Sequence, residues 1–263
     1  MSADAPVSST VALPTGVRMP LIGLGTWQMR GAECRRAVGW ALEAGYRHVD
    51  TATMYGNESQ VGAGLRESGL AREDVFVTTK LLPDHVGRER RALDESLKAL
   101  GTDHLDLWLV HWPPAGAGVD TWRAFVQARE EGLVRSIGVS NYSLDQVDTL
   151  VEATGVTPAV DQVRWSPLLY DRSFAEGLRA RGVVLEGYSP FKGGSLRASA
   201  VTDIAARHGV TPSQVVVRWH VQHEAVVIPK SAHRDRIVSN ADVAGLHLDA
   251  DDMGTLDRLA SVS

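Results

Sequence analysis

Four polar residues stand at the ends of short apolar segments, and their types suit proton transfer to a bound small molecule. Asp50 ends the segment GYRHVD, and Tyr55 follows it five residues later. Lys80 ends VFVTTK, and His111 follows LDLWLV. Taken singly, Asp50 fits a helix cap, Tyr55 a loop aromatic and His111 a packed core residue. If the three segments are neighbouring parallel strands, all four side chains meet at one edge of a sheet.

Lys80 is the least ordinary of the four. The chain has 27 Lys and Arg residues but only 4 lysines, so arginine supplies most of its surface charge. An ammonium group at the end of an apolar strand needs a partner, and Asp50 is a suitable one. The pair is expected to favour the phenolate of Tyr55, lowering its pKa from the ordinary ~10. Tyr55 then serves as an acid, while His111 donates a hydrogen bond to a bound carbonyl oxygen.

A second polar group follows the last apolar segment, VVIP. It contains Lys230, Ser231, His233 and Arg236, and the last three open a predicted helix whose N-terminus favours an anion. The pattern fits a phosphate site and fits a solvated basic turn equally well. The stretch GLGTWQ at residues 23–28 is not a dinucleotide fingerprint, because glutamine replaces its third glycine.

The elements that must position these residues alternate regularly along the chain. Short apolar segments, typical of parallel strands covered on both faces, are separated by amphipathic stretches such as RERRALDESLKALG. Two helix starts carry capping boxes, Ser143 with Gln146 and Thr211 with Gln214. The predicted strands are residues 21–25, 48–50, 75–80, 105–110, 134–138, 159–162, 183–188 and 226–229.

The spacing of these strands predicts the fold. Their ends recur every 22 to 41 residues, about one strand and helix each, with no linker between two halves. We therefore predict an α/β protein with a single (β/α)8 TIM barrel domain spanning residues 1–263. A short hairpin around Thr15 and Gly16 is expected to close its bottom. In such barrels the functional groups lie where the strands end.

Composition excludes several classes of protein. The 263 residues are 44% hydrophobic and 22% charged, with a net charge of −5, which fits a globular chain and gives no basic surface for nucleic acid or membrane. Cys34 is the only cysteine, so no intrachain disulfide forms. The start, MSADAPVSST, does not read as a signal peptide. A soluble, cytoplasmic monomer is expected.

Several sequence motifs match the pattern of a known family, and the chain resembles the aldo-keto reductase superfamily, as a short, bacterial-type member. The matching stretches are LIGLGTW, GYRHVDTA, LDLWLVHWP, IGVSNY, PAVDQ, GYSP and IPKS, in the family's order. The resemblance implies that Asp50, Tyr55, Lys80 and His111 are a catalytic tetrad. It also implies an NADPH-dependent oxidoreductase that reduces an aldehyde or ketone to an alcohol by hydride transfer.

The resemblance also implies a cofactor site across the top of the barrel. Ser140, Asn141 and Gln162 match positions that bind the nicotinamide carboxamide, and Tyr188 matches the aromatic that stacks on the ring. Lys230, Ser231 and Arg236 match positions that hold the adenosine 2′-phosphate, with Asn240 near the adenine. The remaining implied contacts to NADPH or NADP+ are Gly25, Thr26, Asp50, Ser189, Pro190, Phe191, Gly193, Ser195 and His233.

Some positions depart from the family pattern. Asp161 stands where many members have asparagine, and Ser166 replaces a common histidine. His233 and Ser239 depart on the adenine side, which is expected to reduce affinity there. Leu82 replaces a large aromatic, which predicts a wider pocket. The expected substrate contacts are Trp27, Met54, His111 and Trp112.

Two other functions fit parts of the sequence. A metal-dependent barrel hydrolase would use His48, Asp50 and His111 as ligands, but Lys80 beside them argues for a site with no metal. A noncatalytic module on the same barrel would bind NADPH without turnover, because a fold does not determine a function. The expected partner in the preferred interpretation is a small carbonyl compound.

Overall fold

Eight parallel strands form one sheet and are hydrogen-bonded in the order in which they occur in the chain. The computed structural model describes residues 9–262. Residues 1–8, where no signal peptide is expected, lie outside the described part. The strands are β3 (Leu24–Gly25), β4 (His48–Asp50), β5 (Phe76–Leu81), β6 (Leu105–Val110), β7 (Val134–Ser140), β8 (Val160–Arg164), β9 (Val184–Tyr188) and β10 (Val226–Val227).

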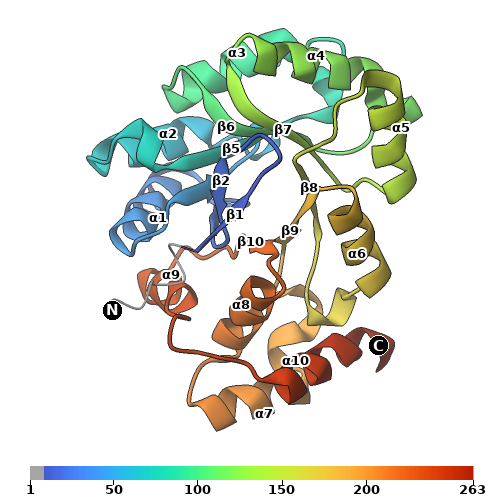
Figure 1. Ribbon diagram of the computed structural model, residues 1–263. Coiled ribbons are helices and arrows are strands. Elements are labelled where there is room, and N and C mark those ends of the chain that lie inside the picture. The colour runs from blue at the N-terminus through green and yellow to red at the C-terminus, as the bar shows by residue number, and fades with distance from the viewer. Residues whose placement is uncertain (1–8, 263) are drawn as a thin grey trace.

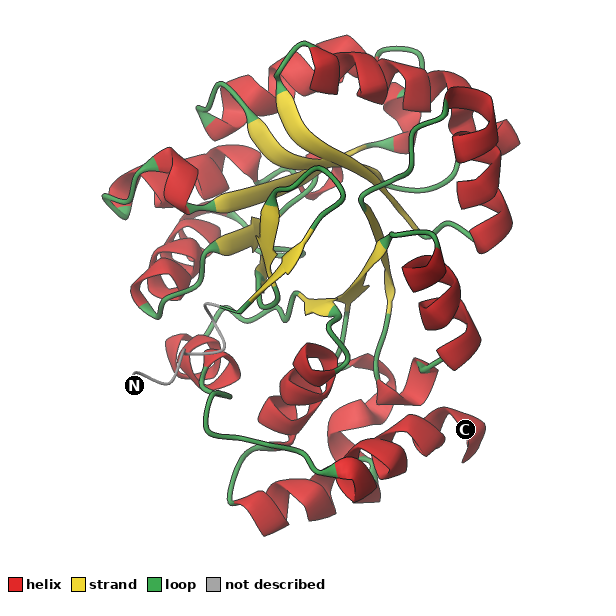
Figure 2. Ribbon diagram, viewed as in Figure 1, coloured by secondary structure: helices red, strands yellow, loops and turns green. Residues whose placement is uncertain are grey.

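The sheet closes on itself between its first and last strands. A parallel bridge joins Ile22 to Val227. The amide of Gly23 donates to the Val227 carbonyl at 2.9 Å, and the amide of Val227 donates to the Leu21 carbonyl at 2.8 Å. Figure 2 shows the strands as an inner ring with helices around it. The predicted (β/α)8 barrel is confirmed.

Amphipathic helices cover the outside of this ring. Both predicted capping boxes are present, at Ser143 before α5 and at Thr211 before α8. Among residues 9–262 no helix is long and apolar enough to cross a membrane. The helices are α1 (Gly31–Glu43), α2 (Glu58–Glu67), α3 (Glu89–Leu100), α4 (Val119–Glu130), α5 (Leu144–Thr154), α6 (Arg172–Ala180), α7 (Ser199–His208), α8 (Pro212–Gln222), α9 (Arg234–Ala241) and α10 (Ala250–Asp257).

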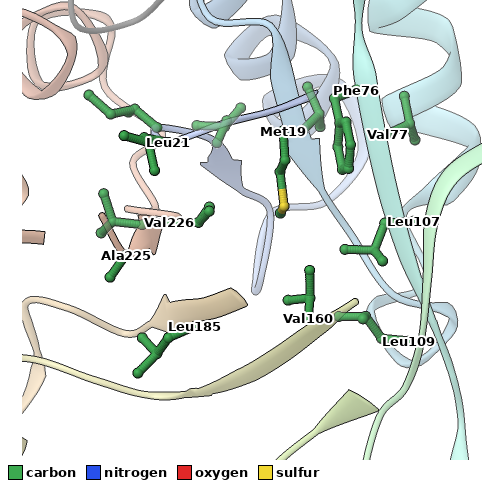
Figure 3. Packing of buried hydrophobic residues seen from close by; sticks show 14 of the residues in the cluster. Met19, Leu21, Phe76, Val77, Leu107, Leu109, Val160, Leu185, Ala225 and Val226 are labelled. Atoms are coloured by element: carbon green, nitrogen blue, oxygen red, sulfur yellow. The ribbon is translucent and has the colours of Figure 1, made fainter. Parts of the chain in front are cut away.

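The predicted hairpin lies across one end of the barrel (Figure 1). It consists of β1 (Thr10–Ala12) and β2 (Arg18–Pro20), which pair antiparallel. The Thr15 hydroxyl in its turn lies 2.7 Å from the hydroxyl of Ser136 in β7, near the start of that strand. Met19 of β2 is fully buried and faces the barrel interior near Leu107 and Val160 (Figure 3). The hairpin therefore closes the bottom of the barrel, as predicted.

Two strands are shorter than the sequence suggests. β3 covers residues 24–25 of the predicted 21–25, and β10 covers residues 226–227 of the predicted 226–229. Pro229 has no N–H group to extend the ladder. The backbone there still closes the barrel, because the Gly25 amide donates to the Pro229 carbonyl at 3.2 Å. The shorter strands leave loop backbone at the carboxyl end of the ring.

Candidate active site

The carboxyl ends of β4 and β5 place an ion pair inside the barrel. Lys80 is fully buried, and its Nζ donates to Asp50 Oδ1 at 2.6 Å and Oδ2 at 2.7 Å. A third bond, 2.9 Å long, goes to the carbonyl oxygen of Thr51. The strands are in register with Asp50 opposite Thr78, so Lys80 lies two residues further along the same inward face. The expected pairing of Lys80 with Asp50 is confirmed.

Both members of this pair lie away from water, and the surroundings determine their charge. Burial by itself would lower the pKa of Lys80, but attraction to Asp50 and Tyr55 outweighs burial, and the pKa is raised. Asp50 accepts a further hydrogen bond from the Gln162 side-chain amide at 2.8 Å. A carboxylate with this many donors and an adjacent ammonium group remains an ion pair.

Tyr55 lies beside the ion pair on a short 3-10 turn, Thr53–Tyr55, between β4 and α2. The Thr53 hydroxyl donates to the Lys80 carbonyl at 2.9 Å and ties this turn to β5. Lys80 Nζ lies 3.5 Å from the Tyr55 hydroxyl. The turn therefore presents the phenol to the ammonium group.

The expectation of a lowered pKa for Tyr55 is wrong. Burial raises the pKa of the phenol more than Lys80 lowers it, and Asp50 raises it further. The contribution of Lys80 has the predicted sign, but it does not dominate. Tyr55 consequently keeps its proton throughout the neutral range.

His111 follows β6 and lies opposite the phenol, with its ring centroid 6.0 Å from that of Tyr55. It is nearly buried, and burial together with the charge of Lys80 lowers its pKa to about 2, so the imidazole is neutral. Its Nδ1 is buried without a hydrogen-bond partner among the described residues. Trp112 stacks on the imidazole at 3.9 Å between centroids. Nε2 is therefore the imidazole nitrogen that is available to bind a ligand.

These side chains lie at the base of a cavity of about 350 Å³. Three large apolar residues at the cavity are unusually exposed, Trp27 at 38%, Met54 at 38% and Trp112 at 37%. All three were expected to contact substrate. The cavity is lined by Gly25, Trp27, Gln28, Asp50, Met54, Tyr55, His111, Trp112, Ser140, Asn141, Gln162, Tyr188, Ser189, Pro190, Phe191, Lys192, Ile228 and Lys230.

The ends of β7, β8 and β9 form one hydrogen-bonded wall of the cavity. The Ser140 hydroxyl donates to the Gln162 carbonyl at 2.7 Å. Asn141 donates to the Ser140 hydroxyl at 3.0 Å and accepts from the Tyr188 hydroxyl at 2.9 Å. Asn141 has a φ of +64°, a conformation that asparagine tolerates better than most residues. These hydrogen bonds join the ends of β7, β8 and β9 to one another.

Several expected cofactor contacts lie outside the cavity lining. The Thr26 and Ser195 hydroxyls donate to backbone carbonyls, of Asp50 and Pro190 respectively. Ser231 caps its own turn by accepting from the His233 amide at 3.1 Å. Helix α9 begins at Arg234, later than the sequence suggested. The expected contacts outside the lining are Thr26, Gly193, Ser195, Ser231, His233, Arg236 and Asn240. Leu82, expected to widen the pocket, also lies outside it.

Three lining residues were not named individually among the expected contacts. Gln28 has a φ of +62°, and Ile228 belongs to the closing seam of the barrel. Lys192 follows β9, and the scarcity of lysine that singled out Lys80 would also have singled out this residue. Three of the four lysines, Lys80, Lys192 and Lys230, lie in or beside the cavity.

The metal-site interpretation has no support in the described residues. Nowhere in residues 9–262 do three or more His, Cys, Asp or Glu side chains form a group that could hold a metal ion. His48 lies 3.1 Å from the Thr78 hydroxyl, and Asp50 is engaged by Lys80.

Known proteins share both the sequence and the architecture. A model of the aldo/keto reductase family matches residues 21–261. An aldo-keto reductase of Mycolicibacterium smegmatis is 43% identical over 96% of this chain and 94% of its own length. The methylglyoxal reductase DkgA of Salmonella typhimurium is 40% identical over 95% and 92%.

Solved structures of other proteins have the same architecture. An aldo/keto reductase from Brucella melitensis superposes with a TM-score of 0.94 at 39% identity, covering 98% of this chain and 99% of that one. An aldo-keto reductase from Bombyx mori in complex with NADP superposes with a TM-score of 0.90 at 32% identity, covering 95% and 92%. The order of strands, the paired lysine and aspartate and the matched sequence lead to one conclusion: this chain belongs to the aldo/keto reductase family.

Proposed function

We propose that this protein is an NADPH-dependent reductase that converts an aldehyde or ketone to an alcohol, with Tyr55 as the general acid. The observation that carries this proposal is the buried Lys80–Asp50 ion pair, whose ammonium group lies 3.5 Å from the Tyr55 hydroxyl at the base of the cavity. Proton donation to a carbonyl oxygen needs a protonated acid next to a stabilising positive charge, and this site has both.

The chemistry of the cavity fits a nicotinamide dinucleotide. Its lining includes two residues with side-chain amides, Asn141 and Gln162, the aromatic Tyr188 and two lysines, Lys192 and Lys230. Amides suit a carboxamide, an aromatic ring suits stacking, and lysines suit phosphates. The Bombyx mori relative is described in complex with NADP, which supports the same cofactor here. When bound, NADPH supplies the hydride.

Tyr55 moves the proton. Because its pKa is raised, the phenol is protonated at neutral pH and can donate to a carbonyl oxygen as negative charge develops there. Lys80 stabilises the phenolate that this step leaves, and Asp50 and the Thr51 carbonyl hold the ammonium group in place. The phenolate then recovers a proton from solvent.

His111 orients the substrate. A neutral imidazole can donate one hydrogen bond from Nε2 to the carbonyl oxygen, and it does not compete with Tyr55 for the proton because its pKa is lowered to about 2. Stacking on Trp112 holds the ring orientation. Trp27, whose ring centroid lies 4.8 Å from that of Tyr55, and Met54 supply apolar surface for the rest of the substrate. Methylglyoxal, named for the Salmonella relative, is a suitable first substrate to test.

Replacing Tyr55 with phenylalanine tests the proposal. Tyr55→Phe removes the proton donor but leaves the ring, so carbonyl-dependent NADPH oxidation is expected to fall at least ~10²-fold, the usual scale of general acid catalysis. NADPH binding, followed by fluorescence titration, is expected to persist. The assay should cover aldehydes, ketones, sugars and α-keto compounds, methylglyoxal included.

Tyr170→Phe is the matched control, because Tyr170 lines a different cavity. It is expected to retain wild-type turnover. Turnover of Tyr55→Phe close to that of the control would contradict the role of Tyr55 as the acid.

A further inference from the structure

A buried carboxyl group inside the barrel is not used by the mechanism described above. Glu186 lies on β9, two residues before Tyr188, so its side chain occupies the layer one step deeper than the cavity wall. It is fully buried, and neither of its carboxyl oxygens accepts a hydrogen bond of normal geometry from the described residues, although the Gln162 amide is close enough to lower the pKa of the carboxyl group. Burying a carboxylate with so little hydrogen bonding costs free energy. We therefore expect the Glu186 carboxyl group either to be protonated or to have a function.

The surroundings of Glu186 come from several strands and include few groups that could neutralise it. From β4, His48 Nε2 approaches to 3.8 Å, and Asp50 contributes a negative charge. From β5 comes the ammonium group of Lys80, which Asp50 already neutralises. From β8, Gln162 pairs in register with Glu186, while from β10 its register partner is the apolar Val226.

His48 does not supply a compensating positive charge. Its imidazole is fully buried, and burial followed by repulsion from Lys80 lowers its pKa to about 3. The ring is packed against the backbone just before β3, where a Cβ on Gly23 would come within 2.4 Å of His48 Nδ1. His48 is therefore a neutral neighbour and does not compensate the charge of an ionised Glu186.

Glu186 is also linked to the ion pair beside Tyr55. Gln162, its register partner, donates to Asp50 Oδ2 at 2.8 Å, and Asp50 binds Lys80 Nζ. Burial, followed by repulsion from Asp50, raises the pKa of Glu186 to about 8 and outweighs the opposing effects of the Gln162 amide and of Lys80. The carboxyl group is neutral at pH 7, and its proton leaves to solvent as the pH rises through this value.

We propose that Glu186 is a positioning residue for the proposed reduction: its neutral carboxyl group preserves the field that Lys80 exerts on Tyr55, and ionisation of Glu186 weakens Tyr55 as an acid. Electrostatics determines the direction of this effect on the acidity of Tyr55. A negative charge next to Lys80 and Asp50 opposes formation of the phenolate, and proton donation by Tyr55 becomes slower. This inference rests on the function proposed above.

The test is the pH dependence of carbonyl reduction in Glu186→Gln, which is isosteric and always neutral. The wild-type kcat is expected to fall with an inflection near pH 8. In Glu186→Gln the inflection near pH 8 is expected to disappear, and the ratio of variant to wild-type kcat should rise from near one at pH 7 to roughly threefold or more well above pH 8. KM and NADPH affinity at pH 7 should not change.

Asp161→Asn is the matched control. Asp161 is another fully buried carboxyl group, on the neighbouring strand β8, but it precedes Gln162 and so faces away from the barrel interior. The Asp161→Asn variant is expected to keep the alkaline inflection in the pH profile of kcat. An inflection in Glu186→Gln at the wild-type position would overturn the proposed role.

A second measurement is independent of turnover. Asp161→Asn removes the other buried carboxyl group, whose pKa is raised to about 7 and which would contribute in the same pH range. Infrared difference spectra of Asp161→Asn across pH 8 should show loss of the carbonyl stretch of a protonated buried carboxyl group, and the double variant Asp161→Asn/Glu186→Gln should lack this change. An Asp161→Asn protein with no such change would overturn the inference. An Asp161→Asn protein that shows the change but reduces no carbonyl compound would overturn the proposed reduction and the positioning role with it. Turnover with an unchanged pH profile would overturn only the role of Glu186.

Discussion

At the scale of single residues, Asp161 is the position where a departure from the family pattern has a measurable consequence. Its side chain is fully buried, with Oδ2 unpaired among the described residues and the Tyr142 amide 3.5 Å from Oδ1. Burial raises its pKa from the usual range to about 7, so it binds a proton more tightly in the folded than in the unfolded protein.

This shift predicts how Asp161→Asn changes stability with pH. Because the folded-state pKa is raised, the wild type is most stable below the unfolded-state pKa, loses stability between about pH 4 and pH 7, and stays at the lower level above. The amide that replaces the carboxyl group does not titrate. We expect the variant to unfold at nearly the wild-type urea midpoint at about pH 4 and to be more stable by roughly 1–3 kcal/mol at pH 8. A pH-independent difference would contradict this assignment.

Residue types and their places at strand ends identified the tetrad candidates, and the structure places Asp50, Tyr55 and His111 at one cavity with Lys80 bonded to Asp50. Lys80 was singled out by the scarcity of lysine and by its place at a strand end, both of which are visible in the sequence. The pKa of Tyr55 was predicted with the wrong sign, because sequence reasoning counted Lys80 and Asp50 but could not count burial. Burial depends on what packs around a group, and neighbours distant in the chain determine it.

At the scale of elements, the closing seam between β3 and β10 depends on the absence of a side chain. A Cβ on Gly25 would lie 2.7 Å from the Ile228 carbonyl oxygen, closer than such atoms approach in folded proteins. Both residues line the cavity. The seam therefore sets the shape of the cavity as well as the closure of the barrel.

Gly25→Ala is expected to separate the two backbones and to destabilise the protein by roughly 1–3 kcal/mol, with weaker NADPH binding. Urea unfolding and fluorescence titration measure the two effects. Gly39 in α1 provides the contrast, because a Cβ there meets nothing within 4 Å. Gly39→Ala should raise stability by about 0.5–1 kcal/mol through helix propensity. Equal behaviour of the two variants would contradict the steric argument.

The elements themselves were largely predictable. Apolar runs of strand length, amphipathic periodicity and two capping boxes are local signals, and the structure contains all eight strands and both caps. The ends of β3 and β10 differed by two or three residues because strand length depends on pairing with a partner far away in the chain.

At the scale of the whole molecule, the proposed cofactor site spans the ring from β7 and β8 to α9. Lys230 lines the cavity, whereas Arg236 lies on α9 outside it. The Tyr46 hydroxyl, from the loop after α1, donates to the Ile237 carbonyl at 3.0 Å and holds this helix against the barrel. A ligand that contacts both regions must extend beyond the cavity.

Arg236→Ala tests this extended site. If Arg236 binds the 2′-phosphate, the dissociation constant for NADPH is expected to rise about tenfold or more, and that for NADH to change little, since NADH lacks this phosphate. Fluorescence titration with each cofactor measures both values. Arg234→Ala is the control, because Arg234 lies on the same helix as Arg236 but its side chain pairs with Glu43 of α1 at 3.5 Å. Equal losses for the two cofactors would mean that Arg236 holds no 2′-phosphate.

The sequence by itself determined the barrel, the candidate tetrad and the family, because these depend on local periodicity and on residue types at strand ends. Only the tertiary structure decided which of those residues share a cavity, that Tyr55 keeps its proton and that Glu186 lies unpaired beneath it. Each of these depends on burial and on distances between strands that are remote in the chain. Desolvation is a property of the packed molecule, so no stretch of sequence shows it alone.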